Sequence, residues 1–194
     1  EASATFRTRW RDPRRELLIE RGLQHENAYV RHLRDLGKTV LELDTEYSTD
    51  DSAEHTDKDR ADGSAKDSTG NRAKHNAKDR AHGSAEESTK HSARDSAQAA
   101  AIDAMRTGAD VITQAVLRDG PWGGRADLLL RVDEPSALGS WSYEVADTKL
   151  AHETRGGTVL QLCVYSDLLG RLLERRPERM HVVRPGPGFP TDTY

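Results

Sequence analysis

An acidic and a basic side chain end an otherwise apolar stretch near the middle of the second half of the chain. Residues 141–149 read WSYEVADTK, so Asp147 and Lys149 stand two residues apart. Alternate residues of a β-strand share a face, so these two lie on one face and Glu144 on the other. Buried charges need partners. The pair is therefore either a structural ion pair or a metal-binding carboxylate beside a lysine, at a phosphodiester-cleaving site.

A second acid, Asp127, lies in an expected strand over residues 125–132 and precedes three leucines. A short polar turn connects this strand to the one that ends in Asp147, so the two strands are expected to be antiparallel neighbours. Two carboxylates brought that close repel each other unless a cation lies between them, and oxygen ligands suit Mg²⁺ or Mn²⁺. Asp127 is thus either a cap at the strand edge or half of a divalent-cation site.

The first expected helix, over residues 14–37, contributes His25 and Glu26. His25 shares a helical face with Leu18 and Tyr29 and should point toward the sheet, where it is either a hydrogen-bonded core histidine or a ligand. Glu26 lies on a neighbouring apolar face and needs a partner. Gly22 is expected to let this helix approach the sheet closely.

A later expected helix, over residues 158–174, carries Gln161 and Tyr165 four residues apart and hence on one face. The pair is either a core tyrosine with a glutamine at its rim, or two side chains that face the site and contact substrate phosphate or the surroundings of the metal.

Hydrophobic periodicity and turn residues predict an α/β sandwich with a mixed sheet. The expected elements in order are helix 14–37, strand 38–43, helix 92–106, strand 110–117, strand 125–132, strand 141–149, helix 158–174 and strand 180–183.

Residues 48–99 contain no Val, Ile, Leu, Met, Phe, Trp, Tyr or Cys, and KDRADGSA at 58–65 returns as KDRAHGSA at 78–85. Such a segment cannot bury enough apolar surface to offset the entropy of ordering it. We therefore expect a repetitive disordered or transiently helical insertion at 48–99 in one domain formed by 1–47 and 100–194. The insertion's histidines are irregularly spaced, which does not favour a metal site there: His55, His75, His82 and His91.

Composition narrows the function classes. The net charge of −4 gives no global basic signature, so contact with nucleic acid must come from a local patch. The single cysteine, Cys163, excludes an internal disulfide framework and a four-cysteine cluster, and we expect it to be buried. No signal peptide or long apolar run is present, so a cytoplasmic location without a membrane span is expected. The first residue is not Met and the last lie in a polar, Pro-rich stretch, so we expect part of a longer protein.

Together these motifs resemble the RecB-like nuclease family of the PD-(D/E)XK superfamily, and more closely its branch found in larger proteins with RNase H-like or helicase regions. The residues that carry the resemblance are Arg21-Gly22-x-x-His25-Glu26, Gly124-Arg125-Ala126-Asp127, Asp147-Thr148-Lys149 and Gln161-x-x-x-Tyr165. The resemblance covers nearly all of the chain outside the insertion. It implies a restriction-endonuclease-like αβββαβ core, which is similar to the element order expected above.

The resemblance also implies roles for individual residues. Asp127 and Asp147 match the metal-binding carboxylates, and His25 matches a further metal ligand. Lys149 matches the lysine that orients the attacking water. Gln161 and Tyr165 match the accessory pair of the site. Glu26, Arg125 and Arg155 are possible accessory residues, the two arginines as local basic groups for DNA. The implied cofactor is Mg²⁺ or Mn²⁺, without the iron–sulfur cluster of some relatives.

The implied activity is metal-dependent hydrolysis of DNA in repair or processing, together with a helicase or RNase H-like region. An alternative from another class is a catalytically inactive DNA-binding or scaffolding module of such an assembly. RNA as the substrate stays open. The repetitive insertion departs from the family pattern.

Overall fold

The computed structural model describes residues 13–43 and 92–194. The predictions for residues 48–91, with the repeat and its four histidines, lie outside the described residues. Residues 13–43 and 98–194 belong to one unit of the fold, and this unit carries every candidate site residue.

A mixed six-stranded sheet forms the centre of this unit, in the spatial order β1-β2-β3-β4-β5-β6. The β1–β2 and β4–β5 pairs are parallel and the others are antiparallel. The predicted mixed α/β sheet is confirmed, and β6 is an addition that its short polar sequence did not reveal. The strands are β1 (Val40–Glu42), β2 (Val111–Asp119), β3 (Trp122–Val132), β4 (Ser142–Thr148), β5 (Met180–Val183) and β6 (Thr191–Thr193).

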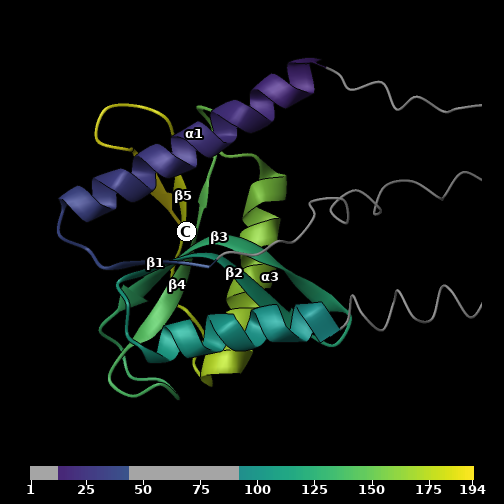
Figure 1. Cartoon of the computed structure of the whole chain (residues 1–194), viewed down its shortest axis with the longest axis vertical. Coiled ribbons are helices and arrows are strands. Elements are labelled where there is room, and N and C mark those ends of the chain that lie inside the picture. The colour runs from purple at the N-terminus through teal and green to yellow at the C-terminus, as the bar shows by residue number, and fades with distance from the viewer. Residues whose placement is uncertain (1–12, 44–91) are drawn as a thin grey trace, which may run out of the picture. The chain divides into compact units, whose positions relative to one another are not determined.

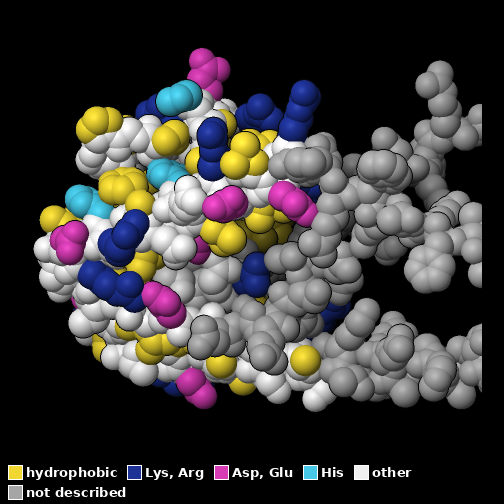
Figure 2. Space-filling view, turned by 45° about the horizontal axis from the view of Figure 1, so that its top comes forward, with side chains coloured by type: hydrophobic (Ala, Val, Ile, Leu, Met, Phe, Trp, Pro, Cys, Tyr) yellow, Lys and Arg dark blue, Asp and Glu magenta, His cyan; other side chains and the backbone are white. Residues whose placement is uncertain are grey.

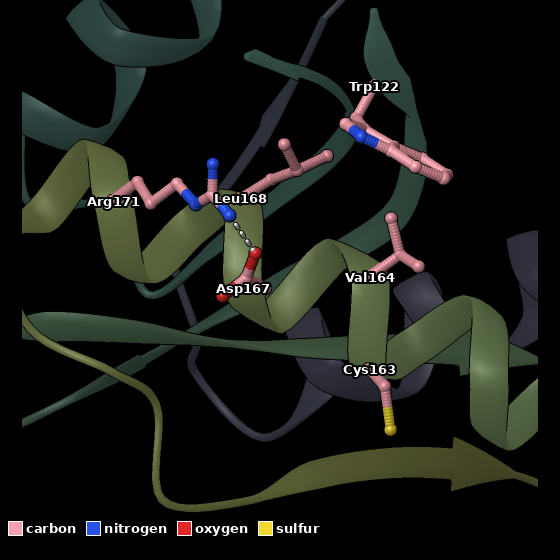
Figure 3. Close-up of a pocket in the computed structure, with 6 residues that line it drawn as sticks. All are labelled: Trp122, Cys163, Val164, Asp167, Leu168 and Arg171. Carbon is pink, nitrogen blue, oxygen red and sulfur yellow. Dashed lines mark ion pairs between the residues drawn. The ribbon is translucent and has the colours of Figure 1, made fainter. Parts of the chain in front are cut away.

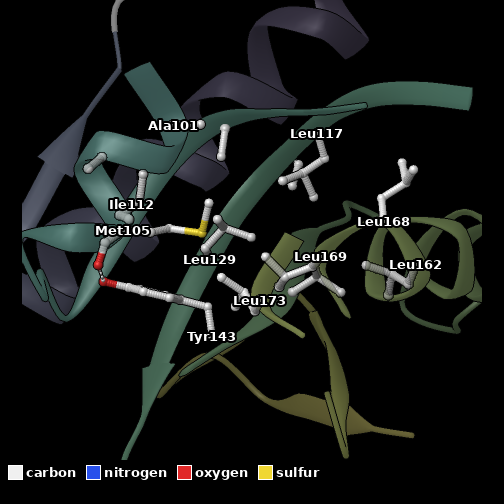
Figure 4. Close-up of a cluster of buried hydrophobic side chains, with 14 of the residues drawn as sticks. Ala101, Met105, Ile112, Leu117, Leu129, Tyr143, Leu162, Leu168, Leu169 and Leu173 are labelled. Atoms are coloured by element: carbon white, nitrogen blue, oxygen red, sulfur yellow. Dashed lines mark hydrogen bonds between the residues drawn. The ribbon is translucent and has the colours of Figure 1, made fainter. Parts of the chain in front are cut away.

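Helices cover both faces of the sheet (Figure 1). On one face lies α1 (Pro13–Asp35), which packs through Tyr29, Val30 and Leu33. On the other lie α3 (Gly156–Leu173) and residues 98–106 of the helix that precedes β2. Figure 4 shows the larger cluster of buried side chains, which fills the space between the sheet and the latter two helices. In the described part of the chain, no helix is long and apolar enough to cross a membrane.

The N-terminal half of α1 corrects two expectations. Leu18, which was expected to face the sheet with His25, is 61% exposed. A methyl group placed on Gly22 would have no atom within 4 Å. The buried residues of α1 begin at Tyr29, so the helix rests on the sheet only through its C-terminal half. Gly22 therefore does not serve a close approach to the sheet.

The predicted helix over residues 92–106 is confirmed, and it overlaps the expected insertion at 48–99. Residues 92–106 are helical, so residues 92–99, which were assigned to the disordered insertion, form its first turns. Alanine has the highest helix propensity, and the segment is rich in it. Ala101, Ala104 and Met105 are buried against the sheet, which anchors the helix where propensity alone would leave it marginal.

The alternation of side chains in β2 and β3 is interrupted at one level of the sheet. Ile112 and Ala115 are three residues apart, yet both pack in the cluster beneath α3, and Ala126 and Leu129 do the same on β3. Regular strands alternate with period two, so the face must switch between those residues. Gln114 lies at the switch, with a left-handed φ of 57° that non-glycine residues rarely adopt.

Candidate active site

The two aspartates meet where the pairing of β3 and β4 ends. The ladder runs from Val132↔Ser142 to Leu128↔Ala146, so the next residues along, Asp127 and Asp147, face each other. The two carboxyl groups are close enough for Asp127 to raise the pKa of Asp147. Asp127 Oδ2 also accepts hydrogen bonds from the Thr148 backbone N, at 3.1 Å, and from its Oγ1, at 3.4 Å. The predicted antiparallel pairing and the meeting of two carboxylates are confirmed.

Asp147 is held in an environment that opposes its ionisation. Its exposure is only 3%. Burial and the neighbouring Asp127 carboxylate raise the pKa of Asp147 to about 7, although Lys149 lowers it. The Lys149 ammonium lies 2.7 Å from Asp147 Oδ2 but donates its hydrogen bond to Oδ1, at 2.9 Å. Both carboxylate oxygens of Asp147 are therefore in contact with the ammonium group, and a divalent cation would compete with it for them.

Lys149 remains a charged group. Burial alone would lower the pKa of its ammonium, but Asp147, Asp127 and Tyr165 together outweigh burial and raise that pKa. Its backbone N donates to the Val183 carbonyl, at 3.0 Å, which fixes the chain just beyond β4. The ammonium is thus positioned as a cation beside the two carboxylates, and it is too strongly protonated to act as a base.

A third carboxylate approaches from α1. Glu26 is partly buried, and burial followed by the Asp127 charge raises the pKa of its carboxyl group. The Gln114 side-chain amide donates a hydrogen bond to Glu26 Oε1, while the charges of Arg125 and Lys149 lower the pKa. The turn of α1 that carries Glu26 therefore faces the same end of the β3–β4 pair. Its predicted need for a partner is confirmed, with Gln114 as that partner.

His25 lies beside this group without joining its carboxylates through a described contact. Its Nε2 is 3.3 Å from the Val183 carbonyl oxygen, the same oxygen that accepts from the Lys149 amide. Its ring stacks on Phe189 with centroids 5.8 Å apart. Within residues 13–43 and 92–194, no three His, Cys, Asp or Glu side chains are close enough together to hold one ion. The role of His25 as a ligand stays a prediction.

The predicted Gln161–Tyr165 pair is formed. Gln161 Nε2 donates to Tyr165 Oη, at 3.1 Å, on the face of α3 that turns to β3. There the Tyr165 ring rests against Gly124, where a methyl group would lie 2.5 Å from Tyr165 Cε1 and Oη. Because Tyr165 also influences the pKa of Lys149, its hydroxyl belongs to the same site. Glycine at 124 is therefore what allows Tyr165 to stand beside the aspartates.

Replacing Gly124 by Ala should move the Tyr165 ring and leave the fold intact. The clash is with the tip of a side chain rather than with backbone, so the ring can swing outward and break its bond to Gln161. We expect cleavage activity to fall to the level of Tyr165→Ala, with the melting temperature little changed.

Gly123→Ala is the matched control, because its methyl group would meet the Arg118 side chain instead of Tyr165. Equal activity losses in Gly123→Ala and Gly124→Ala would contradict the role given to the Tyr165 contact.

Glu144 points away from the site, as strand parity predicted. Its carboxylate is buried and bonds His181 Nε2, at 2.8 Å, while Arg179 Nε lies 3.5 Å from the other oxygen. The second ring nitrogen of His181 contacts Thr193 Oγ1, at 3.1 Å, so this group ties β4 to β5 and β6. The acid three residues before Asp147 thus has a structural partner of its own.

Replacing Glu144 by Gln should therefore keep most of the cleavage activity, while Asp147→Asn removes it. The variant loses one charge-assisted hydrogen bond, a loss of about 1.5–3 kcal/mol in the free energy of unfolding. Single-turnover cleavage and thermal melting measure the two effects separately. A folded Glu144→Gln protein as inactive as Asp147→Asn would show that Glu144 acts in the site.

The two predicted basic residues, Arg125 and Arg155, differ in what the structure shows of their relation to the carboxylates. Arg125 is close enough to lower the pKa of Glu26. Arg155 is exposed and immediately precedes α3.

The prediction of a buried Cys163 is wrong, because this thiol is exposed on α3. The buried residues of α3 include Leu162 and Leu169, one heptad apart, and residue 163 falls beside that stripe.

Two residues that bind the site carboxylates were not predicted from the sequence. Gln114 binds Glu26 from within β2, and Thr148 binds Asp127 through its amide. A polar residue inside the apolar run VITQAVL was the available signal for Gln114, since such a residue in a buried strand needs a partner. Thr148 acts mainly through its backbone, which no side-chain pattern reports.

Comparisons of the chain with protein-family models, with curated proteins and with solved structures find no match. Chemically, the site offers two adjoining carboxylates, a third nearby, a fixed ammonium group and a phenol whose oxygen accepts from Gln161. Such a set can bind a hard divalent cation and donate hydrogen bonds to an anionic substrate.

Proposed function

We propose that this chain is a metal-dependent nuclease of the RecB-like type, which hydrolyses phosphodiester bonds of DNA. The observation that carries the proposal is the buried pair Asp127 and Asp147 with Lys149 beside it. A structural ion pair needs only one acid and one base. A second carboxylate contributes to raising the pKa of Asp147 to about 7, which costs stability, and raised pKa values of this kind cluster at functional sites.

The residues fit a divalent cation. Asp127 and Asp147 place two carboxylate groups across from each other at the end of the β3–β4 ladder. Oxygen donors of this type suit Mg²⁺ or Mn²⁺, with Glu26 and His25 as the nearest further candidates. When bound, the cation supplies Lewis-acid polarisation of a phosphoryl oxygen and a lower pKa for an attacking water.

The other side chains have complementary roles. The Lys149 ammonium, held by Asp147, orients the water and stabilises negative charge that develops on the phosphoryl oxygens. Tyr165 accepts from Gln161 and keeps its own proton to donate to a phosphate oxygen. The water oxygen forms a bond to phosphorus while one ester P–O bond breaks, and the leaving oxygen ends as a hydroxyl group.

The order of elements also supports this proposal. A helix followed by the three-stranded β2–β3–β4 meander, then α3 and the parallel strand β5, corresponds to the αβββαβ core expected of restriction-endonuclease-like proteins. A helicase or RNase H-like region in a longer chain, and a cytoplasmic location, belong to the same proposal.

DNA would be held by a few basic groups rather than by a broad basic surface. On the face that Figure 2 shows, Lys and Arg side chains are interspersed with Asp and Glu. The contacts to phosphate would come from Lys149 in the site, from Arg125, whose charge lowers the pKa of Glu26, and from the exposed Arg155 before α3. Such binding weakens as the salt concentration rises, because each contact releases counterions from the DNA.

The direct test is to incubate the purified chain with end-labelled single- and double-stranded DNA and RNA, with Mn²⁺ and with EDTA. We expect DNA cleavage that requires Mn²⁺ and disappears in Asp147→Ala. Binding without cleavage under all conditions would favour the inactive DNA-binding module. Cleavage confined to RNA would identify a ribonuclease.

Metal binding should depend on pH in a predictable direction. A carboxyl group whose pKa is higher in the folded protein stabilises the fold when protonated. This stabilisation is present below the unfolded value near 4, and it is lost as the pH rises toward the folded value of about 7. Mn²⁺ favours the ionised carboxylate, so the melting-temperature gain from Mn²⁺ should grow between pH 5.5 and pH 8.

At a hundred times its Kd, the ion should contribute about 2.7 kcal/mol of stability. Thermal melts with and without Mn²⁺ across this pH range measure the effect, and Asp147→Asn should abolish it. A gain from Mn²⁺ that is the same at pH 5.5 and pH 8 would contradict the raised pKa of Asp147.

A further inference from the structure

A cavity of about 300 Å³ lies between the β2–β3 hairpin and α3, outside the group of carboxylates. Figure 3 shows the Trp122 indole on the hairpin side and Val164, Leu168 and the Arg171–Asp167 ion pair on α3. Trp122 is 63% exposed, a large aromatic surface left in solvent. The cavity is of the size that small organic groups occupy, and much of its wall is apolar.

The charges in this cavity select the kind of occupant. Arg171 lies 2.5 Å from Asp119 and 2.8 Å from Asp167, so two carboxylates already neutralise its guanidinium. The group carries a net charge of −1, which disfavours a phosphate or a carboxylate. It favours an uncharged planar group with an apolar face for Trp122 and a polar edge for the ion pair.

The cavity adjoins the proposed catalytic site. Trp122 is two residues from Gly124, which contacts Tyr165, and Val164 is the neighbour of Tyr165 on α3. A polymer whose phosphate lies at Tyr165 would therefore bring its adjoining group to Trp122. In nucleic acids that group is a base, which is uncharged and planar, with donors and acceptors at its edge.

We propose that this cavity binds an unpaired nucleobase, stacked on Trp122 and held at its edge by Asp167 and Arg171. This inference rests on the proposed nuclease function and makes its substrate a nucleic acid with a single-stranded or unstacked nucleotide beside the cut. A base inside a duplex cannot reach Trp122, so single strands bind better than duplexes.

The test compares a fluorescently labelled oligothymidine with an abasic strand of equal length, in EDTA so that binding is measured without cleavage. Both strands carry the same phosphates. Stacking on aromatic side chains is worth about 1–3 kcal/mol per base, so Trp122→Ala should weaken oligothymidine binding about 5- to 150-fold and leave abasic binding unchanged. Trp122→Phe should retain most of the affinity. Leu36→Ala, at an equally exposed apolar residue, should change neither.

Unchanged oligothymidine binding in Trp122→Ala, or an equal loss on both strands, would overturn the base site. A change of oligomeric state in that variant, with nucleic-acid binding intact, would show instead that the cavity docks a protein segment. The two proposals fail separately. If binding depends on the base and on Trp122 but no Mn²⁺-dependent cleavage is seen, only the nuclease proposal is contradicted. If cleavage is seen without such binding, only the base site is contradicted.

Discussion

Replacing either Asp127 or Asp147 by Asn is expected to abolish Mn²⁺ binding and cleavage, and replacing both should cost little more. The two carboxyl groups lie across from each other at the end of the β3–β4 ladder, and Asp127 raises the pKa of Asp147. If one cation bridges them, each single substitution already removes that cation, and the effects are not additive. The affinity loss should exceed the hundred-fold or so that removing an outer-shell partner causes.

Calorimetric titration with Mn²⁺ and single-turnover cleavage of the two single variants and the double variant measure this coupling. Asp103→Asn serves as the control, because Asp103 is an exposed acid that pairs with Arg106 on its own helix. Additive losses in the double variant would show that the two aspartates hold no common ion.

Replacing Lys149 by Met should separate catalysis from metal binding. Met keeps most of the side-chain volume and removes the charge that we propose orients the water and stabilises the phosphoryl oxygens. Loss of such a stabilising group costs about 10²- to 10³-fold in rate. Mn²⁺ affinity should persist or increase, because the ammonium group that competes for Asp147 at 2.7 Å is gone.

Because Lys149 lowers the pKa of Asp147, its removal should raise that pKa, so single-turnover rates and calorimetry are measured over a series of pH values that extends above pH 8. Lys38→Met, which removes an exposed lysine near Asp110, should leave both unchanged. If Lys149→Met loses Mn²⁺ binding together with cleavage, the lysine supports the fold of the site and is not a group of the reaction.

Local patterns were enough to predict most of the elements and the central pair. Strand parity placed Asp147 beside Lys149 and Glu144 on the other face, and the short connection after β3 brought Asp127 to Asp147. Spacing by four on a helix predicted the Gln161–Tyr165 bond. All of these follow from rules that act over a few residues or between adjacent strands.

The expectations that proved wrong depend on where one element ends relative to another. The apolar pattern of α1 indicated an inward face along its whole length, but only its C-terminal half packs on the sheet. Leu18 is therefore exposed, and Gly22 has no other element beside it. Cys163 lies among apolar neighbours in the sequence but outside the buried stripe of α3. The partners Gln114 and Thr148 were not predicted from the sequence. Gln114 lies where β2 switches face, and Thr148 binds through its backbone amide, and neither feature produces a periodic pattern of side chains.

The left-handed backbone conformation at Gln114 limits which residue types can occupy position 114. Most residues are strained at that φ, and those that tolerate it best are Gly, Asn and Asp. Of these, only Asn keeps an amide donor for the Glu26 carboxylate, on a shorter side chain. Divergent chains with the same site should therefore be restricted to Gln or Asn at this position. A β-branched residue there would mark a chain in which β2 is regular and Glu26 has lost its partner.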